Sequence, residues 1–262
     1  MEEKHKKNFL ERMVEQKRGE IPRLRRERAL SSDSHRPHSN PSFLSAFTKG
    51  PLPRIIAEVK RASPSKGALN PGLDPVNQAK LYQRGEAKAI SVLTDAHFQG
   101  TLNDLEAVAA AVDLPILRKD FILDSIQLKE SLVAGASAVL LIAAILSPKE
   151  LKELVEKSLE LGLEPLVEVH IRDEMEKVLA TPARIIGINN RDLETFQVDL
   201  EVAETLAPLV AKDRVVVAES GISTREDVER LMAVGVENFL VGEALVRAED
   251  PREKLRELMG HG

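Results

Sequence analysis

The chain has 262 residues, of which 43% are hydrophobic and 30% charged, and a formal net charge of -5 at pH 7. This composition is typical of a folded globular protein, and no apolar run approaches the roughly 18 residues that a membrane span needs. The absence of Cys excludes disulfides, thiolate metal sites and a cysteine nucleophile, and the acidic balance argues against general nucleic-acid binding.

Residues 1–50 precede the first predicted strand and contain one predicted helix, followed by the loop SSDSHRPHSNPS. The segment is locally basic in KHKK and RLRRER, but acids are mixed with the bases and no apolar segment of signal-peptide type is present. We therefore expect a cytoplasmic protein with neither nucleic acid nor membrane as a partner. The segment is interpreted as an N-terminal helical extension that covers one end of the following domain or contributes cations to an anion site.

Eight short apolar, β-branched runs follow, and each predicts a strand. They are IIAEVK, AISVLT, PILRKD, AVLLIAA, PLVEVH, RIIGINN, RVVVAES and NFLVGEA. Their spacing leaves room for a helix and two loops between successive strands, as in the βαβ units of a parallel sheet.

The intervening segments have the start and stop signals of amphipathic helices. In SPKELKELVEKSLELG, Ser147 can cap the helix, Pro148 suits its first turn and Gly162 ends it. In STREDVERLMAVG, Ser223 is the predicted cap, with Glu226 three residues later. Eight such units predict an α/β fold, a (β/α)8 TIM barrel over residues 51–262, in one domain with the extension. An open doubly wound sheet is the alternative, disfavoured because no GxGxxG turn follows the first strand.

Polar residues gather where these predicted strands end, which is where barrels of this kind build their active sites. Strand alternation divides the residues that point into the mouth of the barrel from those that point toward the helices. The inward set is Glu58, Lys60, Lys119, Glu168, Asn189 and Glu219. By the same parity Arg118 and Val169 face the helices, so Arg118 is expected in a structural ion pair.

Gly221 and Gly242 follow the last two strands, where loops commonly present backbone N–H groups to a phosphate. Ser63 and the cations of the first loop can add hydrogen bonds and charge. The histidines, His97 and His170 included, lack the spacing of a metal site, so no metal is expected and these two are interpreted as surface or hydrogen-bonding residues.

The motifs AEVKRASPSKG, ISVLTD, PILRKDFI, GINNRDL and VAESGI are specific enough to name a family, because they occur in its order and at strand ends. Together they closely resemble indole-3-glycerol-phosphate synthase, and the resemblance covers nearly the whole chain. It implies a decarboxylating lyase of tryptophan biosynthesis that converts 1-(2-carboxyphenylamino)-1-deoxyribulose 5-phosphate into indole-3-glycerol phosphate, carbon dioxide and water. It also implies that no cofactor is needed, and it makes other tryptophan-pathway enzymes candidate partners.

The resemblance assigns roles to individual positions. Lys119 is similar to the family's general acid and Glu168 to its general base, while Lys60 resembles a substrate-binding lysine and Glu58 a residue that tunes these lysines. Asn189 matches the family's polar residue on the sixth strand and is assigned to the catalytic set with them. The other positions expected to meet substrate or its phosphate are Arg191, Glu219, Ser63, Ser220, Gly221, Gly242, Phe121 and Phe98. Glu243 departs from the pattern, because some members carry a serine there and a carboxylate would repel a phosphate.

Two other readings use the same barrel. Lysines at strand ends can form Schiff bases with keto-sugar phosphates, as in class I aldolases. A barrel that only binds a phosphosugar is a non-enzymatic alternative, disfavoured by the number of ionisable groups aimed at one mouth. Membership of the related phosphoribosylanthranilate isomerase family is disfavoured. The acid-base pair of that family is a cysteine and an aspartate, and this chain has no Cys.

Overall fold

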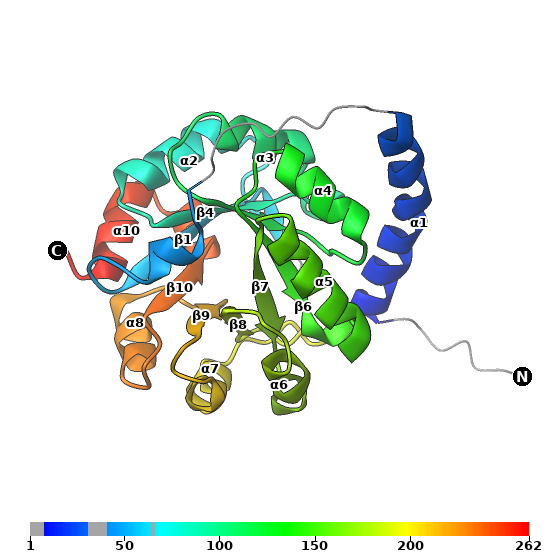
Figure 1. Cartoon of the computed structure of the whole chain (residues 1–262). Helices are drawn as coiled ribbons and strands as arrows, with labels where there is room; N and C mark the ends of the chain where they lie inside the picture. Colours follow the sequence, from blue (N-terminus) through cyan, green and yellow to red (C-terminus); the bar gives the residue numbers. More distant parts are fainter. Residues whose placement is uncertain (1–7, 31–40, 64–65, 262) are drawn as a thin grey trace, which may run out of the picture.

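The computed structural model describes residues 8–30, 41–63 and 66–261. In this part of the chain, eight parallel strands close into a barrel with helices outside it (Figure 1). The basic KHKK segment and most of the loop SSDSHRPHSNPS lie outside the described residues. Within those residues, no helix has the length and apolar character needed to cross a bilayer.

The barrel strands coincide with the eight predicted runs. They are β1 (Arg54–Val59), β4 (Ala89–Leu93), β5 (Ile116–Lys119), β6 (Ala138–Ile142), β7 (Glu164–Val169), β8 (Ile185–Asn189), β9 (Val215–Glu219) and β10 (Asn238–Val241). The first strand pairs with the last, with Ala57 beside Val241, so the sheet is closed. This pairing confirms the barrel and excludes the open doubly wound sheet. A small unpredicted hairpin, β2 (Ala62–Ser63) and β3 (Gly67–Ala68), lies in the loop after β1.

Helices connect successive strands and surround the barrel (Figure 1). They are α2 (Pro75–Arg84), α3 (Leu102–Ala109), α4 (Ser125–Val133), α5 (Pro148–Glu160), α6 (Arg172–Leu179), α7 (Glu201–Leu206), α8 (Arg225–Met232), α9 (Glu243–Arg247) and α10 (Pro251–Met259). Short 3-10 turns cover Leu44–Phe47, Ala96–Phe98, Ala143–Ile145 and Ala207–Leu209. Helix α5 begins as predicted, since the Ser147 side chain accepts from the backbone N–H of Glu150 and Pro148 occupies the first turn.

The predicted start of α8 is wrong by one residue. Thr224, rather than Ser223, caps the helix, and its partner in the capping box is Asp227 rather than Glu226. Both spacings fit a capping box in the sequence, but the Asp227 carboxylate accepts the backbone N–H groups of both Ser223 and Thr224, at 2.8 and 2.9 Å. This double acceptance favours the later start.

Strand alternation divides the core into two layers. Ile55, Ala57 and Val59 of β1 face outward and pack in the layer between strands and helices. Ile56 faces the barrel interior, in a second cluster that includes Leu117. Neighbouring strands are in a register that aligns their ends, so that Asn189 lies beside Glu219. The polar residues at these ends therefore share one mouth.

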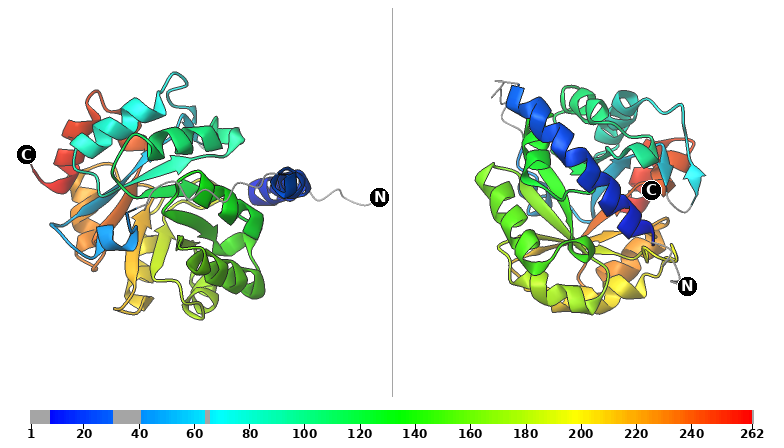
Figure 2. Two further views of the ribbon diagram at one scale, coloured as in Figure 1. Left: turned by 45° about the horizontal axis from the view of Figure 1, so that its top comes forward. Right: turned by 90° about the vertical axis from the view of Figure 1, so that its right-hand side faces the viewer.

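The extension covers both ends of the barrel, whereas the sequence analysis expected one. Helix α1 (Phe9–Leu30) runs diagonally across the molecule in the right-hand view of Figure 2 and contacts α4. Phe9 of α1 lines the cavity at the C-terminal strand ends. At the opposite end, Phe43 and Phe47 are buried against the barrel interior. There the carboxylate of Glu164, the first residue of β7, accepts the backbone N–H of Leu44.

Candidate active site

A cavity of about 980 Å³ opens at the C-terminal ends of the barrel strands. It is lined by every residue predicted for the site, although these come from segments far apart in the chain. They are Glu58, Lys60, Ser63, Lys119, Phe121, Glu168, Asn189, Arg191, Glu219, Ser220, Gly221 and Gly242, with Phe98 beside them. The predicted inward parity of the strand-end residues is therefore confirmed. Arg118 faces the helices as expected, with Nη2 3.0 Å from Asp120.

Lys119 lies between two carboxylates at the centre of the cavity. Its Nζ is 3.1 Å from Oε2 of Glu168 and 3.4 Å from Oε2 of Glu219. Both glutamate side chains are almost fully buried, at 2% exposure each. One buried cation therefore faces two buried carboxyl groups, which compete for it.

These contacts move the pKa values of the three groups in different directions. Burial would lower the pKa of Lys119, but attraction from Glu168, Glu219 and Glu58 outweighs it and raises the pKa, which keeps the ammonium charged. Burial would raise the pKa of Glu168, but Lys119 and His170 hold it well below its usual range. Burial raises the pKa of Glu219 to about 8, with Lys119 opposing the shift and Glu168 adding to it. At neutral pH Glu168 is thus a carboxylate and Glu219 a carboxylic acid.

A second lysine–glutamate pair lies at the C-terminal end of β1, at the cavity wall. Lys60 Nζ lies 2.6 Å from Oε1 of Glu58, and both side chains are mostly buried. Gly242 presses against this pair: a Cβ at position 242 would lie 2.8 Å from Lys60 Nζ and would also clash with the Glu58 carboxylate. Glycine at this position therefore leaves the Lys60 ammonium room at the cavity wall.

The loop after β9 turns sharply into the cavity. Ser220 and Gly221 both have positive φ, 64° and 81° respectively, and for serine this conformation is unusual. Asn190 holds the turn, because its amide donates to the carbonyl oxygens of Glu219 at 3.0 Å and Ser220 at 3.1 Å. The backbone is thus fixed in a form that presents the loop to a ligand.

Glu243, the residue that departs from the family pattern, begins α9 at the cavity edge. Its Oε1 lies 3.2 Å from Nε of Arg247, one turn further along the same helix, and both residues line the cavity. The carboxylate is therefore partly neutralised by a cation that the sequence analysis did not consider. On the other side of the cavity, Arg191 donates from Nη1 to the carbonyl oxygen of Phe196 at 3.1 Å.

An aromatic wall completes the cavity. Phe9 of α1 lies 6.4 Å from Phe98, 6.5 Å from Phe121 and 5.3 Å from Phe196, measured between ring centroids. The chain has seven Phe residues, and four of them meet here, so this wall concentrates the aromatic surface in one place. Phe98 and Phe121 were expected, while Phe9 and Phe196 were not, because no local pattern connects residues so distant in sequence. Within the described ranges, no three His, Asp or Glu side chains are arranged to hold a metal ion.

Comparison with known proteins identifies the family. Residues 10–258 match the family model described as indole-3-glycerol phosphate synthase. The chain belongs to this family. It is 53% identical over 215 residues to the indole-3-glycerol phosphate synthase of Dehalococcoides mccartyi, covering 80% of this chain and 83% of the relative. It is 46% identical over 263 residues to that of Carboxydothermus hydrogenoformans, covering 96% and 99% respectively.

Solved structures agree on the fold at low identity. The chain is similar to one in a tryptophan synthase complex from Pyrococcus furiosus, with a TM-score of 0.61, 16% identity, and coverage of 80% of this chain and 99% of that one. It is also similar to thiamine phosphate pyrophosphorylase from the same organism, with a TM-score of 0.58, 18% identity, and coverage of 80% and 95%. At such identity the likeness shows the barrel fold.

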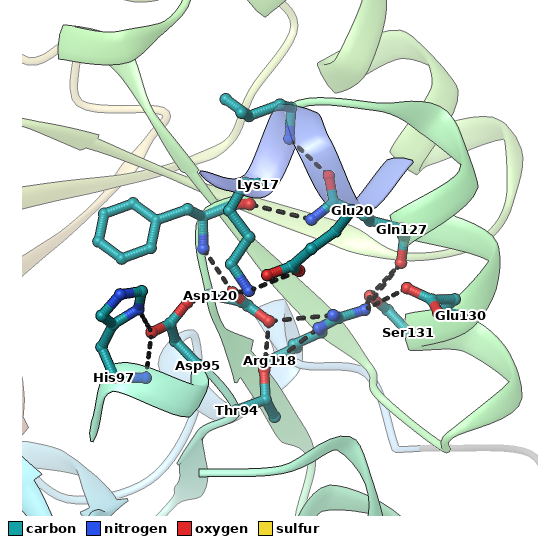
Figure 3. A network of polar contacts seen from close by, with 12 residues as sticks. Lys17, Glu20, Thr94, Asp95, His97, Arg118, Asp120, Gln127, Glu130 and Ser131 are labelled. Atoms are coloured by element: carbon teal, nitrogen blue, oxygen red, sulfur yellow. Dashed lines mark hydrogen bonds and ion pairs between the residues drawn. The ribbon is translucent and has the colours of Figure 1, made fainter. Parts of the chain in front are cut away.

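A buried ionic cluster fastens α1 to the barrel of this synthase family member (Figure 3). Lys17, only 8% exposed, lies 2.9 Å from both Asp95 and Asp120, which follow β4 and β5. Asp120 also accepts from Arg118 and from Thr94, at 3.0 and 2.7 Å. Arg118 packs on the helix side of β5, so Lys119, the next residue, points by strand alternation into the cavity. Lys17 was not predictable from the sequence, since its partners lie far along the chain.

Proposed function

We propose that this protein closes the indole ring, converting 1-(2-carboxyphenylamino)-1-deoxyribulose 5-phosphate into indole-3-glycerol phosphate, carbon dioxide and water. The observation that carries the proposal is the Lys119 ammonium between Glu168 and Glu219 in a cavity with an aromatic wall. The reaction needs a proton donor, a proton acceptor, an apolar surface for a benzene ring and anchors for two anionic ends. Membership of the family supports the same reaction.

In the first step, the ring carbon that carries the carboxylate attacks the ketone carbon, and the ketone oxygen becomes negative. Lys119 acts as the general acid, because its ammonium lies in the cavity and stays charged until a stronger base forms. An alkoxide is such a base, so the proton moves to it as the carbon–carbon bond forms. Glu219, with a pKa near 8, supplies a second protonated group for a substrate hydroxyl.

Loss of carbon dioxide then restores the benzene ring, and loss of water completes the pyrrole ring. Glu168 acts as the general base in the dehydration, because its carboxylate is the one that Lys119 and His170 keep ionised. Lys60 binds an anionic substrate group, and Glu58 orients its ammonium. Asn189 contributes a polar contact beside Glu219.

The anchors for the substrate lie around this centre. The phosphate meets Gly221, Gly242 and Ser63, whose loops offer backbone N–H groups and a hydroxyl. Ser220 and Glu219 meet the sugar hydroxyls, and Arg191 approaches the substrate carboxylate. Phe121 and Phe98 pack against the benzene ring.

The proposal extends to the domain organisation, the cellular location and the partners of the protein. Residues 1–50 and the barrel of residues 51–262 form one domain, because the described part of the extension contributes Met13, Phe43 and Phe47 to the core cluster of the barrel interior. The protein works in the cytoplasm on a small-molecule substrate, with other tryptophan-pathway enzymes as its candidate partners.

Reduction with borohydride distinguishes this function from the Schiff-base aldolase. A Schiff-base lysine needs a neutral amine, whereas the carboxylates around Lys119 stabilise its ammonium. We expect that protein treated with substrate and borohydride keeps its unmodified mass and releases one carbon dioxide per turnover. A reduced adduct on Lys119 or Lys60, without carbon dioxide, would overturn the proposal.

A further inference from the structure

The two carboxylate oxygens of Glu168 face two different cations. Oε2 lies 3.1 Å from Nζ of Lys119, inside the cavity. Oε1 lies 3.2 Å from Nε2 of His170, which follows the same strand two residues later. Both oxygens are therefore engaged, and the carboxylate plane is fixed between a cation in the cavity and a cation behind it.

His170 is itself held by Glu174, in the first turn of α6. The backbone N–H of His170 donates to Oε2 of Glu174 at 2.7 Å, and the ring Nδ1 lies 3.7 Å from the same oxygen. The imidazole is 10% exposed, and within the described residues neither ring nitrogen has a partner with hydrogen-bond geometry. The ring nitrogens therefore face a carboxylate on each side, at 3.2 and 3.7 Å, an arrangement that favours the protonated ring.

Glu219 lacks this support, although it also faces Lys119. Its Oε2 lies 3.4 Å from the ammonium, and neither of its oxygens has a hydrogen-bond partner among the described residues. The two glutamates are equally buried, so burial does not distinguish them. What differs between them is the second cation beside Glu168.

We propose that His170 is a positioning residue that, as a cation held by Glu174, makes Glu168 rather than Glu219 the ionised carboxylate beside Lys119. The inference rests on the proposed function, in which Glu168 is the base. His170 touches no reacting atom in this scheme and acts through Glu168. Its removal should therefore change the pH at which the base becomes available.

The charged groups around His170 agree with a cationic ring. Glu168 and Glu174 face it directly, Asp192 of the loop after β8 adds a weaker negative charge, and Lys119 is the opposing cation beyond Glu168. Glu219 and Glu58 lie further across the cavity, and Lys177 of α6 acts on Glu174. Burial would lower the pKa of His170, but the two nearest glutamates raise it to about 9.

The test is the pH profile of kcat/KM for wild type, His170→Asn and His170→Phe between pH 3 and pH 9, a range that reaches the low pH at which Glu168 is protonated. Without the cation, Glu168 is protonated at a higher pH, so the acid limb moves upward by about one pH unit. At the lowest pH values kcat/KM falls by up to about tenfold relative to wild type, the limit for a shift of one unit, whereas at pH 8 it stays within about threefold. A wild-type acid limb in His170→Asn, which keeps a hydrogen-bond donor without charge, would overturn the proposal.

Two further variants test the role of Glu174 and provide a control for replacing a histidine elsewhere. Glu174→Gln removes the anion that holds the ring and should move the same limb in the same direction by a smaller amount. His261→Asn changes an exposed histidine beside Glu86 and should leave the profile unchanged. If Glu174→Gln behaves as wild type, Glu174 does not hold the cation and the proposal fails in that part.

The charge of His170 can also be measured by NMR without substrate, and so independently of the proposed function. The chain has six histidines, so the ring nitrogens of ¹⁵N-histidine-labelled wild type can be assigned by comparison with His170→Asn. We expect both His170 nitrogens to be protonated at pH 7 and to titrate near pH 9. A neutral ring at pH 7 would overturn the proposal. Failure of wild type to turn over the substrate would instead refute the proposed function, while this spectrum would still report the ion pair.

Discussion

The ammonium of Lys119 lies 3.1 Å from Oε2 of Glu168, although the two residues are 49 positions apart on β5 and β7. Parallel strands of a closed barrel bring their C-terminal ends to one mouth, so residues of the same parity meet there. Glu219 shares the same ammonium at 3.4 Å. The proton donor and proton acceptor of the proposed reaction are therefore in direct contact before substrate arrives.

Lys119→Met is predicted to lower kcat by at least about a hundredfold, because it removes the proton donor of the ring-closing step. Circular dichroism should show the wild-type secondary structure. Lys149→Met, which changes a lysine 85% exposed to solvent, serves as the matched control and should keep full activity. Activity of Lys119→Met near the wild-type level would exclude Lys119 as the general acid.

Glu219→Gln is predicted to gain stability over wild type as pH rises. The pKa of Glu219 is about 8 in the folded protein and near 4.5 when unfolded. Between these values the folded state binds the extra proton, so the wild-type free energy of unfolding decreases with rising pH. Glutamine has no such titration. The difference between the two proteins should therefore grow between pH 5 and pH 8, by on the order of a few kcal/mol, at about 1.4 kcal/mol per unit.

Urea unfolding at several pH values measures this difference. The His170 titration also lowers stability over an overlapping pH range, from its usual value up to about 9, but it is present in both proteins and largely cancels. A difference independent of pH would show that Glu219 is ionised in the folded state.

Gly242→Ala is predicted to raise KM by about tenfold with a small effect on stability. The added methyl group would lie closest to the Glu58 carboxylate and 2.8 Å from Lys60 Nζ, so both side chains of this ion pair must shift, the flexible lysine away from the cavity wall. Steady-state kinetics should show the change mainly in KM, because Lys60 is proposed to bind substrate. Gly19→Ala is the control, since a Cβ there has no atom within 4 Å. An unchanged KM in Gly242→Ala would contradict the proposal that Lys60 binds substrate.

Lys17→Met is predicted to destabilise the fold by about 3–5 kcal/mol, because it leaves two buried carboxylates without their shared cation. The double variant Lys17→Met/Asp95→Asn should recover part of the loss, since Asp120 keeps Arg118. Arg18→Met, on the same helix and 62% exposed, should change stability by no more than about 0.5 kcal/mol. Equal effects of Lys17→Met and Arg18→Met in chemical denaturation would contradict the account.

The fold and the centre of the site could be predicted because their signals are local. Alternation within each strand assigned Glu58, Lys119, Glu168 and Glu219 to the cavity, and the βαβ spacing predicted the barrel that brings them together. The one-residue error at the start of α8 has a similar cause. Two capping patterns overlap at Ser223 and Thr224, and only the contacts of Asp227 decide between them.

The residues that were missed act through contacts that no local pattern contains. Phe9 and Lys17 lie on a helix whose position on the barrel was not predictable, and they meet residues of the loops after β4 and β5. Arg247 has its partner Glu243 one helical turn away, so the i, i+4 spacing could have revealed that pair. His170 has the same spacing to Glu174, and its place two residues after an inward Glu168, on the same face of the chain, was a further available signal.

Indole fluorescence on mixing the purified protein with 1-(2-carboxyphenylamino)-1-deoxyribulose 5-phosphate tests the central claim most directly. The chain contains no Trp, so the protein adds little background emission. The account predicts emission that rises with time in wild type, in step with carbon dioxide release, and is about a hundredfold slower in Glu168→Gln. A folded wild-type protein that binds this substrate without producing indole fluorescence would contradict it.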